Sequence, residues 1–461
     1  MAKGIKKGDI VEIELDNLAH GGESVGHLKG LAIFVPGGIP GERVRVRITE
    51  SKKSYARGEL LKVLRPVEER IDPACPVFAA CGGCQLQQMD YPLQLSHKRR
   101  MVEDLLERLG GLKGVKVNPV IGADYPWGYR NKAQFPLTVD EEGKIVAGFY
   151  RKGTHEVVVH NDCSIQHPLI NRILKETIVV LNQYPLTVYD EKEHTGLLRH
   201  LVIRAGICTN QAILTIVTSR NRFPHREEIA QQLLDRVPEL TGILQNINPG
   251  KTNVILGKRT ELIAGEDYYL DYVGSIRYAI SPESFFQVNT LQTEKLYSTI
   301  LEYAGLTGKE LVVDAYCGIG SIALYIAGRA GRVFGIEEVA GAIEDAKRNA
   351  ELNNITNCTF QVGKVEEKLP ELLAQGIRPD LVIFDPPRKG LAESVIDTVL
   401  TTRPDRLIYV SCNSATLARD LALLQESYRI CRVQPVDMFP QTYHVETMVL
   451  LEKIWEGEEL R

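Results

Sequence analysis

The sequence predicts a multidomain protein with a small N-terminal β-barrel, a β-rich α+β middle domain and a C-terminal α/β domain built on a parallel, doubly wound sheet. Three observations predict this plan. Residues 1–67 hold short alternating segments separated by Gly and Pro turns, and residues 68–280 are mostly strand-like with two interrupting helices. Within residues 281–461, strands and helices alternate strictly from residue 311 onward. A chain of 461 residues has room for about three such domains.

Composition narrows the protein class. The chain is 44% hydrophobic and 25% charged, which is typical of a globular protein. No uncharged apolar run reaches membrane-spanning length, and the first ten residues lack the apolar stretch of a signal peptide, so we expect a cytoplasmic protein without membrane contact. Nine cysteines are too sparse for a disulfide scaffold, which favours ligand or nucleophile roles. Because the net charge is only -4, nucleic-acid binding would have to come from local patches.

The first domain carries such a patch. Residues 41–65 contain eight basic and three acidic side chains, and the arginines of the RVRVRI segment alternate with apolar residues as in a half-buried strand. A small barrel with a basic outer face could hold a phosphate backbone, although an ordinary solvated surface has the same composition. This stretch resembles the TRAM domain, a small OB-like RNA-binding barrel that is appended to several RNA-modifying enzymes.

A cysteine-rich loop follows the barrel. Cys75, Cys81 and Cys84 lie within ten residues of a Gly- and Pro-containing segment, and Cys163, in a polar loop, is the next cysteine along the chain. Their spacing suggests structural zinc first, with nearby histidines as alternative ligands, and an iron-sulfur cluster second. Three unrelated thiols would be the alternative without a ligand. The spacing differs from the C-x3-C-x2-C pattern of radical enzymes.

The middle of the chain contains few chemical signals. Residues 91–110 have an apolar stripe and a basic HKRR segment, which predicts one amphipathic helix that ends at Gly110 and Gly111. Between about residues 115 and 280 the pattern is mostly strand, with helices near 168–182 and 226–236. We find no obvious catalytic constellation in this part of the sequence.

The C-terminal domain begins with a cofactor pattern. The strand LVVDAY is followed by the glycine turn CGIGS and a helix, and the next strand, RVFGIE, ends at Glu337, 23 residues after Asp314. Glycines permit close backbone approach, and an acid at the end of the second strand suits ribose hydroxyls. The turn is not the G-x-G-x-x-G that cradles a pyrophosphate, which favours an adenosine cofactor without phosphates. The D-x-x-x-G-x-G pattern resembles the usual binding turn of S-adenosylmethionine.

Three further residues sit at predicted strand ends. Asp385 begins DPPR, a stiff loop whose Arg388 stands where adenine-specific amino-methyltransferases have an aromatic side chain, although a DPP segment can also simply break a strand. Cys412 lies between a strand and a helix N-terminus, where the helix dipole favours a thiolate; a buried structural cysteine is the alternative. Glu446 begins the last strand. A thiolate that adds to uracil C6, together with a carboxylate that removes the C5 proton, would suffice for methylation at C5.

The motifs DAYCGIG, DPPRKG, SCN and HVETM, in this order, resemble the S-adenosylmethionine-dependent RNA 5-methyluridine methyltransferases, and the likeness covers essentially the whole chain. The barrel and cysteine loop resemble the subgroup that modifies 23S rRNA, whereas tRNA-modifying members are expected to lack both. This resemblance implies methyl transfer from S-adenosylmethionine to C5 of a uridine flipped out of a 23S rRNA loop, through a covalent adduct between cysteine and C6. It suggests no obligate protein partner.

The resemblance also assigns roles to residues. It makes Cys412 the nucleophile and Glu446 the proton acceptor. It implies a Rossmann-like catalytic domain against which the helix near 91–117 packs, and it makes Phe285 or Phe286 available to wall the base pocket. The residues implied to line the cofactor and base pocket are Gln287, Tyr316, Glu337 and Asp385. The residues implied to hold a [4Fe-4S] cluster, in place of zinc, are Cys75, Cys81, Cys84 and Cys163.

Other functions remain open at this point. A tRNA uracil-C5 methyltransferase would use the same chemistry on another RNA, and an RNA-binding ribosome assembly factor would need neither Cys412 nor Glu446. An RNA cytosine-C5 methyltransferase would carry a second cysteine in a PC motif near DPP, and none occurs there. A redox enzyme is disfavoured because the dinucleotide turn is absent.

Overall fold

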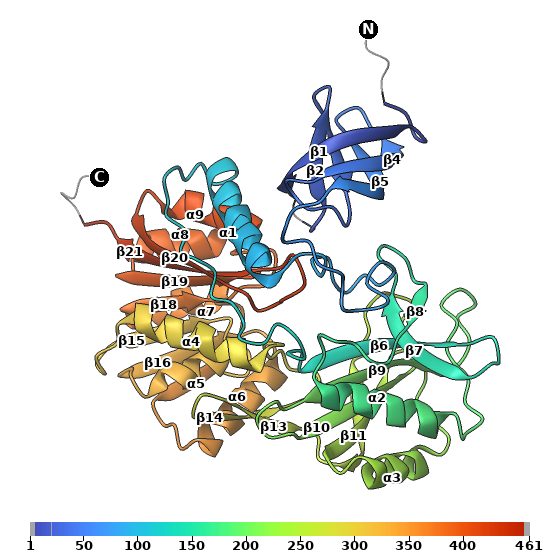
Figure 1. Ribbon diagram of the computed structural model, residues 1–461. Helices are drawn as coiled ribbons and strands as arrows, with labels where there is room; N and C mark the ends of the chain where they lie inside the picture. The colour runs from blue at the N-terminus through green and yellow to red at the C-terminus, as the bar shows by residue number, and fades with distance from the viewer. Residues whose placement is uncertain (1–4, 20, 456–461) are drawn as a thin grey trace.

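The structure, a computed structural model, describes residues 5–19 and 21–455, which form three units (Figure 1). The N-terminal barrel lies at the top of the view, above the junction between the central unit and the C-terminal unit. None of the helices in the described part of the chain has the length and apolar character needed to cross a membrane.

The N-terminal unit is a closed five-stranded barrel with the strand order β1-β2-β3-β5-β4, as the alternating sequence predicts. Apolar side chains on β4 point into the barrel, and the intervening arginines are exposed. The barrel strands are β1 (Ile10–Leu18), β2 (Ser24–Leu28), β3 (Leu31–Val35), β4 (Arg43–Ser51) and β5 (Tyr55–Arg65).

The central unit is a seven-stranded sheet in the order β12-β11-β10-β9-β6-β7-β8. Neighbouring strands pair antiparallel except β10 and β11, which are parallel. Two helices pack on the apolar side chains of this sheet and close its core. Its elements are β6 (Lys132–Val139), β7 (Ile145–Tyr150), β8 (Val157–Val159), α2 (Pro168–Leu181), β9 (Leu198–Ala205), β10 (Ala212–Thr218), α3 (Arg226–Arg236), β11 (Leu240–Ile247) and β12 (Arg259–Gly265).

The C-terminal unit is a seven-stranded sheet in the order β17-β16-β15-β18-β19-β21-β20. Five strands are parallel, as predicted, but β21 runs antiparallel to both β19 and β20, so a reversed hairpin completes one edge. The elements from residue 290 onward are α4 (Thr290–Ala304), β15 (Leu311–Ala315), α5 (Ser321–Ala327), β16 (Arg332–Glu337), α6 (Ala340–Leu352), β17 (Cys358–Val362), α7 (Val365–Ala374), β18 (Leu381–Phe384), α8 (Glu393–Thr402), β19 (Arg406–Ser411), α9 (Ser414–Leu424), β20 (Tyr428–Val436) and β21 (Glu446–Lys453).

Two apolar clusters cover opposite faces of this sheet. One contains residues of α4, α5 and α6, together with the hairpin formed by β13 (Tyr269–Val273) and β14 (Ile276–Ile280). The other contains residues of α7, α8 and α9. Buried side chains that lie on the N-terminal side of residue 281 therefore contribute to the C-terminal core.

Helix α1 (Tyr91–Arg108) also packs on the C-terminal unit, although the central unit surrounds it in sequence. Its apolar face contributes Val102 and Leu106 to the cluster with α9, and the chain that follows pairs Val117 with Val433 of β20. Asp90 caps the helix by accepting a hydrogen bond from the amide of Leu93 at 2.9 Å.

The barrel is joined to both other units by polar contacts. Asn17 donates to the carboxylate of Asp104 on α1 at 3.2 Å. Glu23, nearly buried, binds Lys152, just after β7, at 3.2 Å. Leu18 and Ile39 of the barrel also pack with Leu86 and Met89, so the barrel is held against α1 and the segment that follows the cysteine loop.

Candidate active site

Four chemically important residues lie at one edge of the C-terminal sheet. Asp314 is the next-to-last residue of β15, Asp385 follows β18 and Cys412 follows β19. These three strands are parallel, so their carboxyl ends meet at the same edge. Glu446 begins the antiparallel strand β21 at that edge. Because Ser411 pairs with Thr447, the next step of the register places Cys412 opposite Glu446.

Cys412 lies at the junction of a strand and a helix, as the sequence indicated. Asn413 caps α9 by accepting from the amide of Ala415 at 3.2 Å, so the thiol lies directly before the helix N-terminus. Burial, together with the carboxylates of Glu446 and Asp385, nevertheless raises the pKa of Cys412 to about 11. In the protein without RNA, this shift favours the thiol at neutral pH, and Arg388 opposes it. The preference for thiolate that the helix N-terminus suggests stays a prediction.

Glu446 is a buried carboxyl group with unused hydrogen-bonding capacity. Its side chain is 2% exposed, and Oε1 has no hydrogen-bond partner among the described residues. Burial and the nearby charge of Asp385 raise the pKa of Glu446 well above its usual range, while Arg388 opposes the shift. Burial also raises the pKa of Asp385, to about 7. Such a site favours proton transfer near neutral pH.

The glycine turn after β15 is held by carboxylates from two strands. Asp314, which is buried, accepts from the amide of Ala323 at 2.9 Å, and Glu337 accepts from the amide of Gly318 at 3.2 Å. A side chain at Gly318 would meet nothing within 4 Å, so the turn is open on that side. Burial raises the pKa of Asp314 to about 7. Asp314 was given no role from the sequence. Its position as the first residue of the D-x-x-x-G-x-G motif is the feature that could have identified it.

The remaining predicted pocket residues lie on two loops. Tyr316 has a positive φ of 73° in the glycine turn and is half-buried. Gln287 is buried, and its carbonyl accepts from Asn131 Nδ2 at 2.8 Å, which joins its loop to the central unit. Of the two phenylalanines, Phe285 is 68% exposed and free to contact a substrate, whereas Phe286 belongs to the core.

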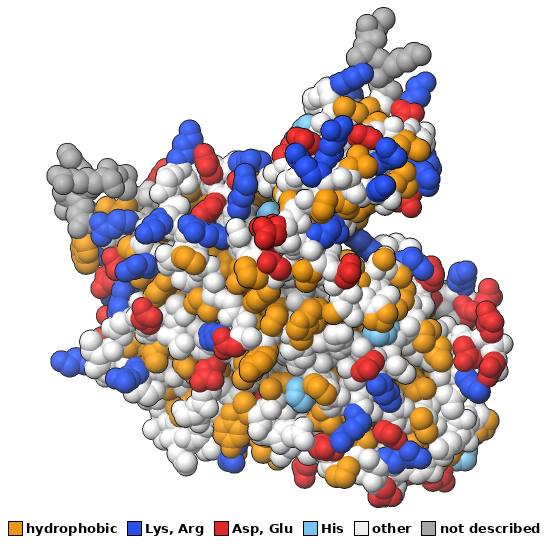
Figure 2. Space-filling view, in the orientation of Figure 1, with side chains coloured by type: hydrophobic (Ala, Val, Ile, Leu, Met, Phe, Trp, Pro, Cys, Tyr) orange, Lys and Arg blue, Asp and Glu red, His pale blue; other side chains and the backbone are white. Residues whose placement is uncertain are grey.

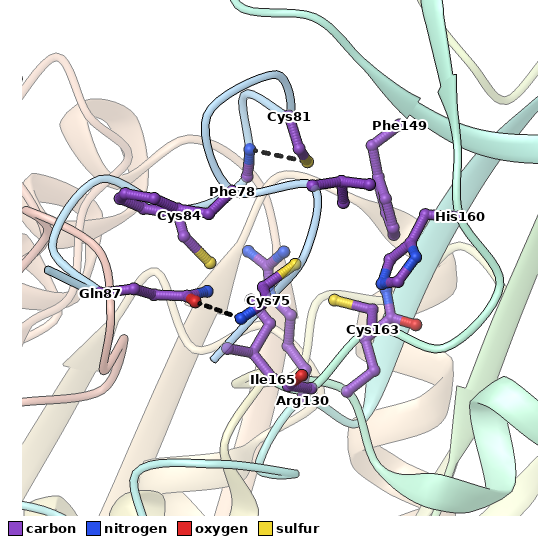
Figure 3. A pocket seen from close by; sticks show the side chains of 14 residues that line it. Cys75, Phe78, Cys81, Cys84, Gln87, Arg130, Phe149, His160, Cys163 and Ile165 are labelled. Atoms are coloured by element: carbon purple, nitrogen blue, oxygen red, sulfur yellow. Dashed lines mark hydrogen bonds between the residues drawn. The ribbon is translucent and has the colours of Figure 1, made fainter. Parts of the chain in front are cut away.

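The four predicted cluster ligands, far apart in sequence, line one cavity between the cysteine loop and the central unit. Figure 3 shows the sulfur atoms of Cys75, Cys84 and Cys163 turned toward the same space, with Cys81 on the opposite side. The amide of Gly83 donates to Cys81 Sγ at 3.3 Å. Burial is the main cause that raises the pKa of Cys84, to about 12, and that of Cys163, to about 11.

This cavity does not have the geometry of a single metal ion. Among the residues that the structure describes, no group of three or more His, Cys, Asp or Glu side chains is arranged to hold one metal ion. A zinc site needs four ligands that converge on one point at about 2.3 Å from sulfur. Within the described residues, the structure therefore shows neither the zinc site nor the iron-sulfur cluster that the sequence suggested.

The barrel surface is less basic than its sequence suggested. Six of the eight basic residues counted in residues 41–65 make ion pairs, and Glu12 alone binds both Arg43, at 3.1 Å, and Arg45, at 2.9 Å. Figure 2 shows Lys and Arg side chains of the barrel interspersed with acidic ones. Arg47 and Lys52 pair with Glu59 and Glu50 inside the counted range. The other four basic residues pair with Glu12, Glu14 and Glu23, which lie before residue 41 and were outside the count.

Comparison with known proteins agrees with this arrangement. The TRAM domain matches residues 5–61, which confirms the expectation for the barrel, and the tRNA (uracil-5-)-methyltransferase family matches residues 90–454. An uncharacterized RNA methyltransferase of Halalkalibacterium halodurans is 44% identical over 97% of this chain and 98% of its own length. An uncharacterized RNA methyltransferase of Clostridium tetani is 44% identical over 97% of both chains.

One solved structure is similar over nearly the whole chain. It is the Pyrococcus abyssi tRNA (uracil-54, C5)-methyltransferase in complex with S-adenosyl-L-homocysteine, with a TM-score of 0.77, 27% identity, and coverage of 96% of this chain and 100% of that one. The expected resemblance to RNA uracil-C5 methyltransferases is confirmed at the level of the family. The chain belongs to the tRNA (uracil-5-)-methyltransferase family and carries an N-terminal TRAM domain.

Proposed function

We propose that this protein transfers a methyl group from S-adenosylmethionine to C5 of a uridine in 23S rRNA, through a covalent adduct between Cys412 and uracil C6. The observation that carries the proposal is the pairing of β19 with β21, which sets a thiol opposite a buried carboxyl group at the strand ends. Addition to a uracil ring and the later elimination need one nucleophile and one base that reach the same ring.

In the first half of the reaction, Cys412 Sγ forms a bond to C6 as a thiolate. The π electrons of the C5–C6 double bond move toward the C4 carbonyl and give an enolate. C5 then forms a bond to the methyl carbon while the bond between that carbon and its sulfur breaks. Arg388, exposed next to the pocket, favours the thiolate electrostatically and could also face the enolate oxygen or a phosphate.

In the second half, Glu446 accepts the proton from C5. The electron pair of the C5–H bond re-forms the C5–C6 double bond, and the C6–Sγ bond breaks to return the thiolate. A carboxylate with a raised pKa is a stronger base than an exposed one, so burial of Glu446 suits this step.

The residues at the glycine turn fit S-adenosylmethionine. Glu337 lies at the end of β16, where an acid can bind ribose hydroxyls, and Asp314 Oδ1 is buried without a hydrogen-bond partner among the described residues. The open side of Gly318 leaves room for close approach to the backbone. Tyr316, Gln287 and the half-buried Asp385 would complete the pocket. The cofactor supplies an electrophilic methyl group.

The cysteine cavity fits a [4Fe-4S] cluster better than a single ion. In such a cluster each thiolate binds a different iron, so the four sulfur atoms surround a volume instead of converging on one point. Cys75, Cys81, Cys84 and Cys163 line one cavity in this way. The hydrogen bond from the Gly83 amide to Cys81 Sγ is of the kind that tunes the reduction potential of iron-sulfur clusters. We assign these residues to a structural cluster.

The choice of 23S rRNA rests on the resemblance of the barrel and cysteine loop to the rRNA-modifying subgroup. A tRNA substrate is the second candidate, because the similar Pyrococcus abyssi enzyme is named for uracil-54 of tRNA and spans 96% of this chain. An alignment over 96% of this chain must include the barrel, so the expectation that tRNA-modifying members lack the barrel is wrong, and the overall domain plan does not separate the two substrates.

Two variants test the chemistry. We expect Cys412→Ala to bind cofactor but transfer no labelled methyl group, whereas Cys431→Ala, a matched change on β20 outside the pocket, stays active. Full activity of Cys412→Ala would end the covalent mechanism. Glu446→Gln should accumulate an RNA adduct on denaturing gels, and only free RNA after long incubation would count against its role as base.

A further inference from the structure

The turn that leads into Glu446 is attached to three distant parts of the chain. It comprises residues 437–442 and connects β20 to the segment before β21. Asp437, fully buried, binds Lys98 of α1 at 2.6 Å and accepts from the Tyr91 hydroxyl at 2.9 Å. The Tyr129 hydroxyl, from the start of the central unit, donates to the carbonyl of Pro440 at 3.0 Å. These hydrogen bonds and the ion pair hold the turn in place and so fix where β21 begins.

Gln441 is the most constrained residue of this turn. It is buried and has a φ of 69°, a left-handed conformation that costs a non-glycine residue about 1 kcal/mol or more. Gln94 of α1 binds it twice: Gln94 Nε2 donates to Gln441 Oε1 at 3.0 Å, and the amide of Gln441 donates to Gln94 Oε1 at 3.1 Å. A strained backbone held by a buried reciprocal pair indicates a position that the surrounding structure must enforce.

The cysteine loop binds the same residue. The amides of Gln85 and Leu86, which directly follow Cys84, both donate to the carbonyl of Gln441 at 3.0 Å. Gln94 Nε2 also lies within hydrogen-bond distance of the carbonyls of Leu86, at 3.1 Å, and Met89, at 3.0 Å. Gln441 is therefore the point where the cysteine loop, α1 and the approach to Glu446 meet.

We propose that Gln441 and Gln94 are positioning residues that make the placement of Glu446 depend on the ordered cysteine loop. The inference rests on the proposed role of Glu446 as base and gives the cysteine loop a task in catalysis without contact with RNA. Cys412 is held separately, by β19 and by the Asn413 cap of α9. Loosening the turn should therefore spare attack by the thiolate and slow the step in which Glu446 takes the C5 proton and the C6–Sγ bond breaks.

The test compares three buried glutamine variants. Gln94→Ala removes both bonds of the reciprocal pair, and Gln441→Ala removes the bond to Gln441 Oε1 but keeps the backbone amide of Gln441. Gln434→Ala is the matched control, because Gln434 is buried on β20 and bonds to the carbonyl of Pro119 but not to Gln441. Rapid-quench single-turnover assays with RNA and S-adenosylmethionine separate adduct formation from adduct breakdown. We expect formation within about twofold of wild type and breakdown slowed about 10- to 100-fold in the first two variants only.

Hydrogen exchange gives a readout that does not depend on turnover. Amides of residues 437–446 should exchange faster in Gln94→Ala, which removes side-chain bonds to the turn, but not in Gln434→Ala. They should also exchange faster in Cys84→Ser, which removes a proposed cluster ligand and so loosens the loop whose Gln85 and Leu86 amides bind the turn. Should Gln94→Ala fail to fold, Gln441→Gly serves in its place, since glycine accepts the positive φ and removes only the side-chain bond.

Two results would overturn the inference: equal slowing of adduct formation and breakdown in Gln94→Ala, or unchanged exchange of residues 437–446 in Cys84→Ser. The failure of the proposed function looks different. If the proposed function fails, Glu446→Gln accumulates no RNA adduct. If only the positioning role fails, Glu446→Gln still accumulates the adduct, but Gln94→Ala and Gln441→Ala break it down at the wild-type rate.

Discussion

The reactivity of Cys412 is set by its surroundings in a way that alkylation can measure. Burial and the carboxylates of Glu446 and Asp385 raise its pKa from the usual 9.0 to about 11. A shift of two units lowers the thiolate fraction at pH 8 about 100-fold. A thiolate of higher pKa is intrinsically more nucleophilic, which raises the rate constant of each thiolate about tenfold and so offsets part of this loss. We therefore expect Cys412 in the protein without RNA to be alkylated about tenfold more slowly at pH 8 than in denaturant.

The assay is a pH series of iodoacetamide labelling in which the peptide that contains Cys412 is quantified by mass spectrometry. The rate should rise about tenfold per pH unit between pH 8 and pH 10, because the thiolate fraction does. Asp385→Asn removes a carboxylate, lowers the pKa of Cys412 and speeds labelling at pH 8. Arg388→Met removes the opposing cation, raises the pKa further and slows labelling.

A labelling profile with its midpoint at or below pH 8 would refute this reasoning, because the helix N-terminus would then dominate over burial. Shifts in the same direction for Asp385→Asn and Arg388→Met would also refute it, since the two side chains carry opposite charges. The expected result implies that binding of RNA must favour the thiolate before attack can occur.

Three further predictions concern the ion pairs and the cysteine loop. Lys98→Met leaves the fully buried Asp437 without its cation and should destabilise α1 by about 3–5 kcal/mol, measured by hydrogen exchange of its amides; loss below about 1 kcal/mol would contradict a paired buried charge. Cys163→Ser, purified without oxygen, should lose iron, sulfide and visible absorption relative to wild type, whereas Cys208→Ser should keep them. Glu12→Gln frees Arg43 and Arg45, so RNA should bind more tightly with a steeper salt dependence, and an unchanged salt slope would exclude these arginines from the RNA contact.

The sequence predicted the elements of the catalytic edge because strand periodicity and turn composition are local. Cys412 and Glu446 were expected at strand ends, and parallel strands necessarily bring their carboxyl ends together. The reversal of β21, which sets Glu446 opposite Cys412, is a matter of pairing between distant segments and left no local pattern. The roles of these residues stay predictions until the variants are measured.

The electrostatic environment of the site was the property that the sequence predicted least well. The helix terminus beside Cys412 is visible in sequence, but the burial that opposes it depends on packing. For the same reason Arg43 and Arg45 read as free basic residues until Glu12, some thirty residues earlier, was found beside them. The contact between Gln94 and Gln441 joins positions 347 residues apart, and neither glutamine differs in type from many surface glutamines.

The central claim is methylation of a uridine in 23S rRNA by a mechanism that needs Cys412. The most direct measurement is a map of 5-methyluridine in 23S rRNA and tRNA from cells that carry wild type, a deletion or Cys412→Ala. We predict that 5-methyluridine disappears from 23S rRNA in both mutant strains and persists in tRNA. Loss of the modification from tRNA alone would contradict the rRNA assignment, and its persistence in 23S rRNA with Cys412→Ala would contradict the mechanism.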